Sequence, residues 1–419
     1  MTDAYRPIEK CRLCGSRHLQ PLFSLGPQVL TGVFRKPEQP DPIAVPLDLI
    51  LCNDCKFLQL RYTVDPGLMY AEYWYRSGIN QTMRDHLAGI TADVKRQVPL
   101  QAGDYVIDTG CNDGTLLLSY NVPGLKRIGV DPSDAILSIK DDSIAKVNTY
   151  FSAKAVKEAL GGKKAKVITS ISMFYDLDDP HSFIKDVRDC LDAEGAWVVE
   201  MNYTGNMILD IGYDMISHEH VAYYTLRTFE RLINMNGMYL NDASFNSING
   251  GSIRLFCGLK DTSTPAVKEI SAREAKVGLE DIATYETCAR RIEDFRVKLT
   301  GLVRGIVARG GKVAAYGAST RGNTFLQHCE FIETDIFAAA DRNPGKWGLV
   351  TPGTRIPIRS EAEVRAARPD YMLVLPYGFL QEFLKREEDY MKAGGKLIVP
   401  LPELCVYSWQ DGKLAKEVL

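Results

Sequence analysis

Two stretches of this chain share a pattern in which a short apolar strand leads through a glycine-bearing turn into a helix. The first spans residues 105–120 and turns between Gly110 and Gly114, and the second starts at residue 313 and turns at Gly317. Each stretch is followed by further strand-like and helix-like segments in alternation. Such alternation builds parallel sheets covered by helices on both faces. The sequence therefore predicts an α/β protein with two doubly wound domains.

The length of 419 residues corresponds to two or three domains at roughly 150 residues each. We predict a small N-terminal module over residues 1–65, an α/β domain over 66–260, a helical connector over 261–300 and a second α/β domain over 301–419. The connector is predicted because apolar residues recur at three- and four-residue spacing between residues 282 and 306.

Fifty basic residues face fifty-three acidic ones, so the net charge is only −3. This balance argues against a protein that coats nucleic acid or an anionic membrane. No apolar stretch approaches the roughly 18 residues of a membrane span, and the first residues lack the apolar core of a secretory signal. We therefore expect a cytoplasmic protein without a membrane or nucleic-acid partner, whose oligomeric state the sequence leaves open.

Four of the ten cysteines form two C-x-x-C pairs, Cys11 with Cys14 and Cys52 with Cys55. Two such turns supply the four thiolates of a tetrahedral zinc site, which leaves no coordination position open for catalysis. The alternatives are four unrelated free thiols or a redox-active pair. We predict one structural zinc ion in the N-terminal module.

The first glycine turn suits a ligand that carries a ribose but no phosphate. Only Gly110 and Gly114 are present, and Asn112 and Asp113 crowd the place where a pyrophosphate would approach the helix. Asp131 ends the next strand, where it could accept hydrogen bonds from both ribose hydroxyls. S-adenosylmethionine fits this turn because its cationic groups tolerate carboxylates. A purely structural strand–turn–helix unit is the alternative.

The second glycine turn has a different chemistry. Ser319 and Thr320 offer hydroxyl groups, Arg321 offers a cationic fork, and Gly317 leaves room for close approach of a ligand. This combination suits a phosphate or pyrophosphate. Asp341 again ends the partner strand. The alternative interpretation is a solvated turn in a domain that only adds stability.

Residues 217–220 read Ser-His-Glu-His and contain the candidate catalytic groups. On an extended or turn segment His218 and His220 would point the same way, and Glu219 could raise the basicity of an imidazole and orient it. Histidines without a chemical role are the alternative. The segment from Asn249 to Arg254 contains a glycine pair and could line the same cleft.

The order of these motifs resembles that of the sugar C-methyltransferases. These are S-adenosylmethionine-dependent enzymes that act on nucleotide-linked 4-keto-deoxysugars, typically at C3. The resemblance covers about residues 8–405. It rests on the paired cysteines, Asp-x-Gly-x-Asn-Asp-Gly from residue 108, His-Glu-His from 218 and Gly-Gly-Ser-x-Arg from 250. The most specific part is the C-terminal signature over residues 315–318 and 352–357.

The resemblance implies a zinc-binding N-terminal module, a middle Rossmann-like methyltransferase domain and a second Rossmann-like domain that helps to hold the sugar nucleotide. The residues expected to bind the methyl donor are Gly110, Asn112, Gly114, Asp131, Pro132, Ser133 and Phe151. The residues expected to bind the sugar nucleotide are Tyr73, Tyr224, Asn249, Arg254, Gly317, Ser319, Thr320, Arg321, Asp341 and Asn343.

The chain departs from the family pattern at three places. Ser217 stands where members often have tyrosine, Asn249 stands where they have histidine, and residues 376–378 read Pro-Tyr-Gly where members often have Trp-Asn. These changes lie in the substrate-facing motifs, so we expect an acceptor that differs from the usual thymidine-linked sugar.

Methylation of a carbon next to a ketone requires a base near neutral pKa and a donor to the enolate oxygen. The resemblance assigns the base to His220, and we expect Glu219 to orient it. The donor is a tyrosine, for which we take Tyr75 as the first candidate and leave Tyr73, Tyr223 and Tyr224 open.

Three other functions fit parts of the sequence. An O- or N-methyltransferase on a sugar nucleotide would use the same base, and a zinc-bearing RNA-binding module would use a vestigial methyltransferase fold. A nicotinamide-dependent oxidoreductase is opposed by the glycine spacing at Gly317.

Overall fold

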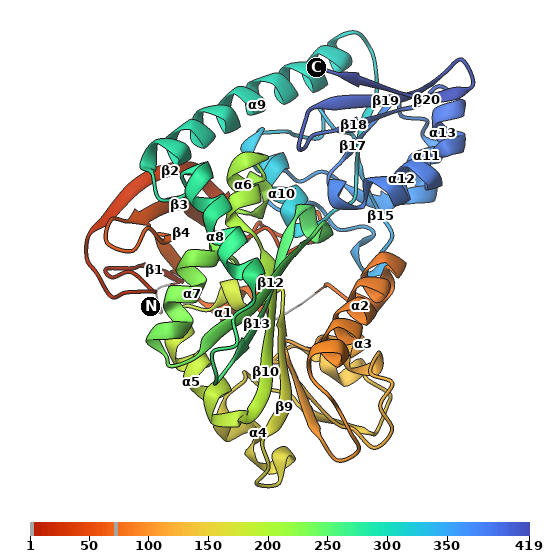
Figure 1. The fold of residues 1–419 in the computed structure, drawn as a ribbon. Coiled ribbons are helices and arrows are strands. Elements are labelled where there is room, and N and C mark those ends of the chain that lie inside the picture. The colour runs from red at the N-terminus through yellow and green to blue at the C-terminus, as the bar shows by residue number, and fades with distance from the viewer. Residues whose placement is uncertain (1–3, 71–73) are drawn as a thin grey trace.

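The computed structural model describes residues 4–70 and 74–419. Figure 1 shows a small N-terminal module at the left, a large α/β part below it, and a second α/β part at the upper right. Within the described residues, no helix combines the length and the apolar character that crossing a bilayer requires.

The N-terminal module is built on a small antiparallel sheet in the order β11-β4-β3-β2. Its strands are β2 (Leu19–Val29), β3 (Ala44–Cys52), β4 (Leu58–Leu60) and β11 (Ala222–Tyr223). A two-stranded sheet joins β1 (Tyr5–Pro7) to β5 (Tyr62–Val64). Because β11 comes from far along the chain, the middle part of the protein completes the sheet of the N-terminal module.

The middle sheet has the order β12-β13-β10-β9-β6-β7-β8. Its strands are β6 (Tyr105–Thr109), β7 (Lys126–Val130), β8 (Ile144–Val147), β9 (Ala165–Ile171), β10 (Leu191–Asn202), β12 (Tyr239–Asn246) and β13 (Ser252–Gly258). The five strands from β8 to β10 are parallel, and β12 and β13 form an antiparallel edge.

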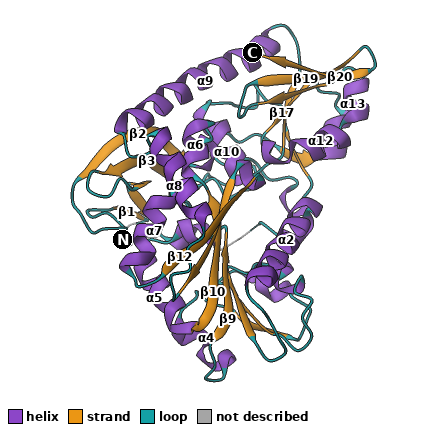
Figure 2. Ribbon diagram, in the orientation of Figure 1, coloured by secondary structure: helices purple, strands orange, loops and turns teal. Residues whose placement is uncertain are grey.

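Helices cover both faces of this sheet (Figure 2). They are α2 (Gln81–Gln97), α3 (Thr115–Leu118), α4 (Ala153–Leu160), α5 (Pro180–Cys190) and α7 (Leu226–Met235). Helix α1 (Pro66–Tyr70) packs instead on the N-terminal module, where Met69 clusters with Leu30, Val45 and Val64, and the short α6 (Thr204–Leu209) follows β10. Side chains alternate between the faces of a strand, so Val106 packs in the core beneath α2, whereas its neighbour Ile107 packs in the core beneath α4 and α5. This is why the strands read as continuous apolar runs.

The C-terminal sheet has the order β16-β15-β14-β17-β18-β19-β20. Its strands are β14 (Val313–Tyr316), β15 (Ala339–Asp341), β16 (Ile358–Ser360), β17 (Tyr371–Val374), β18 (Lys396–Val399), β19 (Cys405–Gln410) and β20 (Lys413–Val418). The helices of this part are α10 (Thr320–His328), α11 (Glu361–Ala366), α12 (Leu380–Arg386) and α13 (Glu388–Lys392). The strands from β16 to β18 are parallel, which confirms the predicted α/β class for both large parts.

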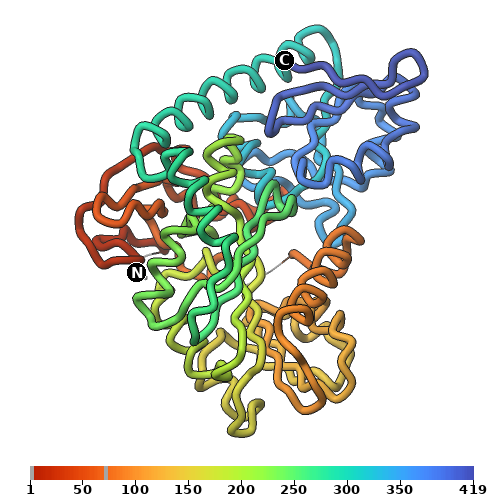
Figure 3. The backbone as a smooth tube through the Cα atoms, viewed as in Figure 1, coloured from red at the N-terminus to blue at the C-terminus, as the bar shows by residue number. Residues whose placement is uncertain are grey.

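Two helices join these parts where the sequence predicted one helical stretch. They are α8 (Pro265–Val277) and α9 (Ile282–Ala308). Gly278 ends α8 at a φ of +78°, a conformation that glycine adopts without steric cost, and Asp281 caps the start of α9. The tube in Figure 3 shows α9 running from the N-terminal module towards the C-terminal sheet.

Arg12, between the first pair of cysteines, docks the N-terminal module onto the middle part. Its side chain is buried and donates to the carbonyl of Leu60 at 2.7 Å and to Thr63 Oγ1 at 2.8 Å. The third donor, Nε, reaches Asp178 Oδ1 at 2.9 Å, just before α5. His181 of α5 also contacts the carbonyl of Leu13 at 2.7 Å. The cysteine loop and the middle part therefore share a buried polar contact.

Arg12→Ala should lower the free energy of unfolding by about 2–4 kcal/mol, because it leaves buried acceptors and the Asp178 carboxylate without their partner. Chemical denaturation measures this change. The matched control is Arg17→Ala, since Arg17 pairs with Glu9 at the exposed surface and such pairs contribute about 0–1 kcal/mol. Equal effects of the two substitutions would contradict the docking role of Arg12.

Candidate active site

The four paired cysteines converge on one point in the N-terminal module. Their sulfur atoms all lie within 4.8 Å of one another, and the Cys11–Cys55 and Cys14–Cys52 sulfurs are 3.6 Å apart. A tetrahedral zinc ion with Zn–S bonds of about 2.3 Å places its sulfurs about 3.8 Å apart, so the cluster fits zinc without rearrangement. Four protein thiolates leave no open position, as a structural site requires.

All three parts of the protein line one cavity of about 650 Å³. The N-terminal module contributes Gly32, Phe34 and Thr63. The carboxyl ends of the parallel strands in both large sheets open onto the cavity, where α/β proteins bind their ligands. Among the predicted site residues, the cavity brings together Tyr75, Gly110, Asn112, Asp131, Pro132, Ser133, Phe151, Glu219, His220, Asn249, Gly317, Ser319, Thr320, Arg321, Asp341 and Asn343.

Asp131 is held at the end of β7 by three hydrogen bonds. Its Oδ2 accepts from the amide of Asn112 at 2.8 Å, and its Oδ1 accepts from the amide and hydroxyl of Ser133 at 2.8 and 2.5 Å. The carboxylate is nearly buried but borders the cavity. It is therefore fixed in place and could accept the ribose hydroxyls of a bound nucleoside.

The segment before α2 closes over this loop. The amide of Ser77 donates to Asn112 Oδ1 at 3.1 Å, and the amide of Gly78 donates to Asp113 Oδ2 at 2.8 Å. Asn112 in turn donates to the carbonyl of Tyr75 at 3.1 Å. The two polar side chains that crowd the turn thus hold a covering segment, and they leave no open helix N-terminus for a phosphate.

Asp341 repeats the geometry of Asp131 in the C-terminal sheet. Its Oδ2 accepts from the amide of Ala318 at 2.9 Å, and its Oδ1 accepts from the amide of Asn343 at 2.8 Å. Asp341 is the last residue of β15, and Asp131 directly follows β7. Each acid stands at the end of the second strand of a parallel pair and accepts a hydrogen bond from the loop after the first strand. The cavity therefore lies between two carboxylates in similar positions, one from each sheet, although Asp341 also has Lys346 Nζ 3.7 Å from its Oδ2.

Arg321 differs from its predicted role as a phosphate-binding fork. Its Nε donates to Asp214 Oδ2 at 2.8 Å, Nη2 donates to Tyr377 Oη at 3.1 Å, and Nη1 donates to the carbonyl of Asn249 at 2.5 Å. Asp214 is buried and neutralises the guanidinium. Arg321 borders the cavity, but its donors join the C-terminal part to the middle part.

His220 is held by a backbone carbonyl, and this corrects the expectation that Glu219 orients it. His220 Nδ1 lies 2.6 Å from the carbonyl of Met215, so that nitrogen carries the hydrogen and donates. The other ring nitrogen, Nε2, makes no hydrogen bond with any residue in the described ranges. Burial lowers the pKa of His220 to about 4, so the imidazole is neutral and Nε2 keeps its lone pair at neutral pH.

Glu219 lies against the N-terminal module. A Cβ added to Gly32 would meet its Oε1 at 2.6 Å, so the carboxyl group occupies the space that the missing side chain leaves. Burial raises the pKa of Glu219 to about 7. His218 turns the other way and its Nε2 contacts the carbonyl of Val45 at 2.9 Å, so the two histidines do not share a site.

Three predicted site residues do not reach the cavity, and a fourth, Tyr73, lies outside the described residues. Tyr224 packs in the aromatic core against Phe57, with ring centroids 4.9 Å apart. Arg254 is buried and donates to Glu200 at 2.8 Å. Gly114 shapes the donor loop from behind, because a Cβ there would meet Ile139 at 2.9 Å. The substrate-binding assignments of Tyr224 and Arg254 are thus corrected.

The cavity also takes in residues that sequence reasoning did not assign, among them Asp108, Tyr175, Asp214, Lys346 and Tyr377. Asp108 is the first residue of the Asp-x-Gly-x-Asn-Asp-Gly motif, and this position could have identified it as a cavity residue. Burial raises its pKa to about 7. Tyr377 lies in the segment 376–378, where the chain departs from the family pattern, and this departure could have identified it. Tyr175, Asp214 and Lys346 had no assigned role at the sequence level.

Comparisons with known proteins agree with the geometry along most of the chain. A zinc binding domain matches residues 11–70, a methyltransferase domain matches 81–241, and a C-methyltransferase C-terminal domain matches 247–402. The C-methyltransferase NovU of Streptomyces niveus is 30% identical over 415 residues, which cover 97% of this chain and 99% of that protein.

Solved structures match a smaller share of the chain. Magnesium protoporphyrin IX methyltransferase (ChlM) from Synechocystis PCC 6803, with bound SAH, is 12% identical, with a TM-score of 0.34 over 44% of this chain and 90% of that one. CalO1, a methyltransferase in calicheamicin biosynthesis in its SAH-bound form, is 16% identical, with a TM-score of 0.33 over 42% of this chain and 55% of that one.

We expect one tightly bound zinc ion per chain, measured by elemental analysis of the purified protein. Cys52→Ser should lose the metal and destabilise the N-terminal module, because a structural zinc site contributes on the order of 10 kcal/mol to folding of its own module. The control is Cys190→Ser, since Cys190 is buried far along the chain from the cluster. Zinc-free protein with unchanged thermal stability would contradict this assignment.

Asp131→Ala should weaken binding of S-adenosylhomocysteine by about 1.5–3 kcal/mol, the range of hydrogen bonds to a charged group. Isothermal titration calorimetry measures the change. Asp134→Ala is the matched control, because Asp134 is exposed three residues further on. Wild-type affinity in the Asp131 variant would remove Asp131 from the donor site.

Proposed function

The chain belongs to the S-adenosylmethionine-dependent C-methyltransferase family, and from this premise we propose that it methylates the carbon next to the ketone of a nucleotide-linked keto-deoxysugar. The bound donor supplies an electrophilic methyl group on a cationic sulfur. The protein must supply a base for the carbon acid, a fixed acceptor geometry and a site that excludes water.

The observation that carries the proposal is the state of His220. Its Nδ1–H is fixed on the Met215 carbonyl, which leaves Nε2 as the nitrogen that can accept a proton. The ring borders the cavity, and burial lowers its pKa to about 4, which keeps it unprotonated at neutral pH but makes it a weaker base than free imidazole. The positive charge that it gains with the proton therefore needs a partner in the cavity. A neutral imidazole at the edge of the donor cavity supports proton removal from carbon.

Glu219 gives the same cavity a second titratable group. Because burial raises its pKa to about 7, the carboxyl group exchanges protons near neutral pH. Glu219 precedes His220 in the chain, but the Met215 carbonyl orients the imidazole. We propose that Glu219 supports the charge that develops on His220, so its loss should slow the reaction less than loss of the base.

The proposal of a nucleotide-linked acceptor rests on the second carboxylate. Asp341 accepts two amides in the same arrangement as Asp131 and faces the same cavity. Such an acid is suited to ribose hydroxyls, as in dinucleotide-binding folds. Asn249 and Tyr377 border the cavity, whereas Ser217 is buried outside it, so two of the three departures from the family pattern face the acceptor and favour a different sugar or carrier.

His220→Asn should lower methylation and deuterium exchange together by about 10²–10⁴-fold, the contribution of a general base. The exchange assay replaces the donor by S-adenosylhomocysteine in heavy water. It uses the keto-sugar nucleotide that gives the largest thermal stabilisation in a screen, and it follows the hydrogen next to the ketone by mass spectrometry.

The matched control is His218→Asn, because His218 is a buried neighbour that points away from the cavity. If His220→Asn loses methylation but exchanges deuterium at the wild-type rate, His220 positions a ligand and is not the base. If wild-type protein methylates without any exchange, the acceptor atom is an oxygen or a nitrogen instead of carbon.

A further inference from the structure

Tyr175 occupies a place in the cavity that neither the motifs nor the comparisons assign. It belongs to a short turn (Phe174–Asp176) directly after β9, at the carboxyl end of the middle sheet. Its ring meets the imidazole of His220 edge-on, with ring centroids 4.4 Å apart and an interplanar angle of 73°. Tyr175 borders the cavity although only 7% of its surface is exposed. It is therefore a neighbour of the proposed base on the cavity wall.

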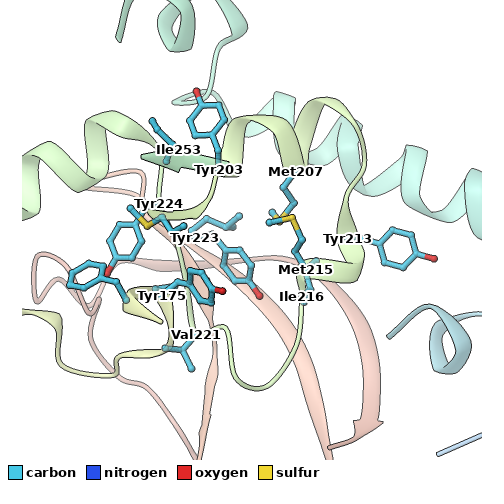
Figure 4. Packing of buried hydrophobic residues seen from close by; sticks show 14 of the residues in the cluster. Tyr175, Tyr203, Met207, Tyr213, Met215, Ile216, Val221, Tyr223, Tyr224 and Ile253 are labelled. Carbon is cyan, nitrogen blue, oxygen red and sulfur yellow. The ribbon is translucent and has the colours of Figure 1, made fainter. Parts of the chain in front are cut away.

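The turn that carries Tyr175 is held by aromatic packing and by a backbone hydrogen bond. The preceding residue, Phe174, packs against Phe183, Trp197 and Phe229, with ring centroids 5.3–5.8 Å apart. The turn itself closes with a hydrogen bond from the amide of Asp176 to the carbonyl of Met173 at 3.1 Å. Figure 4 shows Tyr175 among other buried side chains of the same core, near Val221 and Tyr223. The side chain of Ser172, which also borders the cavity, is a hydrogen-bond partner of the Tyr175 hydroxyl group. A hydroxyl group supported in this way is suited to donate to a developing oxyanion.

The hydroxyl group of Tyr175 stays protonated at neutral pH. Burial and the neighbouring Asp176 carboxylate raise the pKa of Tyr175 well above its ordinary value. A phenol in this state donates a hydrogen bond and does not compete with His220 for the substrate proton.

The other tyrosines fit the donor role less well. Tyr223 and Tyr224 are buried outside the cavity, in β11 and next to it. Tyr75 borders the cavity but is 44% exposed. A donor that remains in contact with water stabilises a developing charge less than one in a dry site. Tyr175 combines contact with the base, burial and a turn held by aromatic packing.

We propose that Tyr175 donates a hydrogen bond to the ketone oxygen of the acceptor while His220 removes the neighbouring proton, which rests on the proposed carbon methylation. The proton passes from carbon to His220 Nε2, and the electron pair of the C–H bond moves to the oxygen as the enolate forms. Tyr175 holds that negative charge. The pair then returns to form the new carbon–carbon bond as the sulfur–methyl bond breaks, the ketone is restored, and His220 releases its proton to solvent.

Tyr175→Phe tests this assignment because it keeps the ring that packs on His220 and removes only the hydroxyl group. We expect deuterium exchange and methylation to fall together by about 10²-fold, the effect of losing one oxyanion donor. Thermal stability and affinity for S-adenosylhomocysteine should remain at wild-type values. Tyr223→Phe is the matched control, since it removes a buried hydroxyl group outside the cavity and should leave both rates unchanged.

Three results would overturn the assignment. The first is deuterium exchange at the wild-type rate in Tyr175→Phe. The second is a loss of exchange in Tyr75→Phe that Tyr175→Phe does not show. The third is a slow Tyr175→Phe variant that also binds S-adenosylhomocysteine weakly, which would mark a packing role. These outcomes are separate from failure of the carbon-methylation proposal, in which the wild-type protein itself would show no exchange.

Discussion

The contact between Arg321 and Asp214 sets the relation between the two large parts of the protein. The guanidinium lies in the first turn of α10, whereas the carboxylate belongs to the middle part and is buried. Tyr377 donates to Asp214 Oδ1 at 3.0 Å, and the carbonyl of Asn249 takes a further donor from Arg321. Breaking one partner of such a cluster leaves a buried charge uncompensated, which is costly. The carboxyl ends of the two parallel sheets are therefore held towards one cavity.

Two further contacts give this cavity its shape. Asp131 and Asp341 each fix the loop after the first strand of their sheet, so two polar anchors of similar geometry stand in the same space. The N-terminal module supplies another wall, because Gly32 makes room for the Glu219 carboxyl group and Arg12 ties the cysteine loop to the middle part. The four paired cysteines do not line the cavity, so the zinc site that they form contributes no group to its wall.

The fold and the local parts of the site could be predicted because their causes are local. The four cysteines converge as their spacing indicates. Asp131 reaches the cavity because a residue at the end of a strand beside a glycine turn can lie in few places relative to that turn. Arg254 could not be placed in this way. Its guanidinium pairs with Glu200 on β10. That strand lies next to β13 in the sheet but far from it in the sequence.

The same limit explains the other differences. Tyr224 was expected at the substrate, but it packs in the aromatic core against Phe57 and Phe174. Contacts between buried aromatic rings are favourable, so the ring packs there when the fold provides the space. His220 was expected to lean on Glu219, yet the turn over residues 217–220 directs Nδ1 to the Met215 carbonyl. Tyr175 carried no motif at all. Its placement follows only from the packing of Phe174 and from the loop that returns His220 to the end of β9.

We propose that one cavity holds the methyl donor at Asp131 and a nucleotide-linked acceptor at Asp341. A crystal structure of the protein with S-adenosylhomocysteine and a nucleoside diphosphate tests this claim most directly. We expect the nucleoside of S-adenosylhomocysteine on Asp131, the ribose of the nucleotide on Asp341, and His220 with Tyr175 between them. A nucleotide bound away from Asp341, or one that displaces S-adenosylhomocysteine from Asp131, would contradict it.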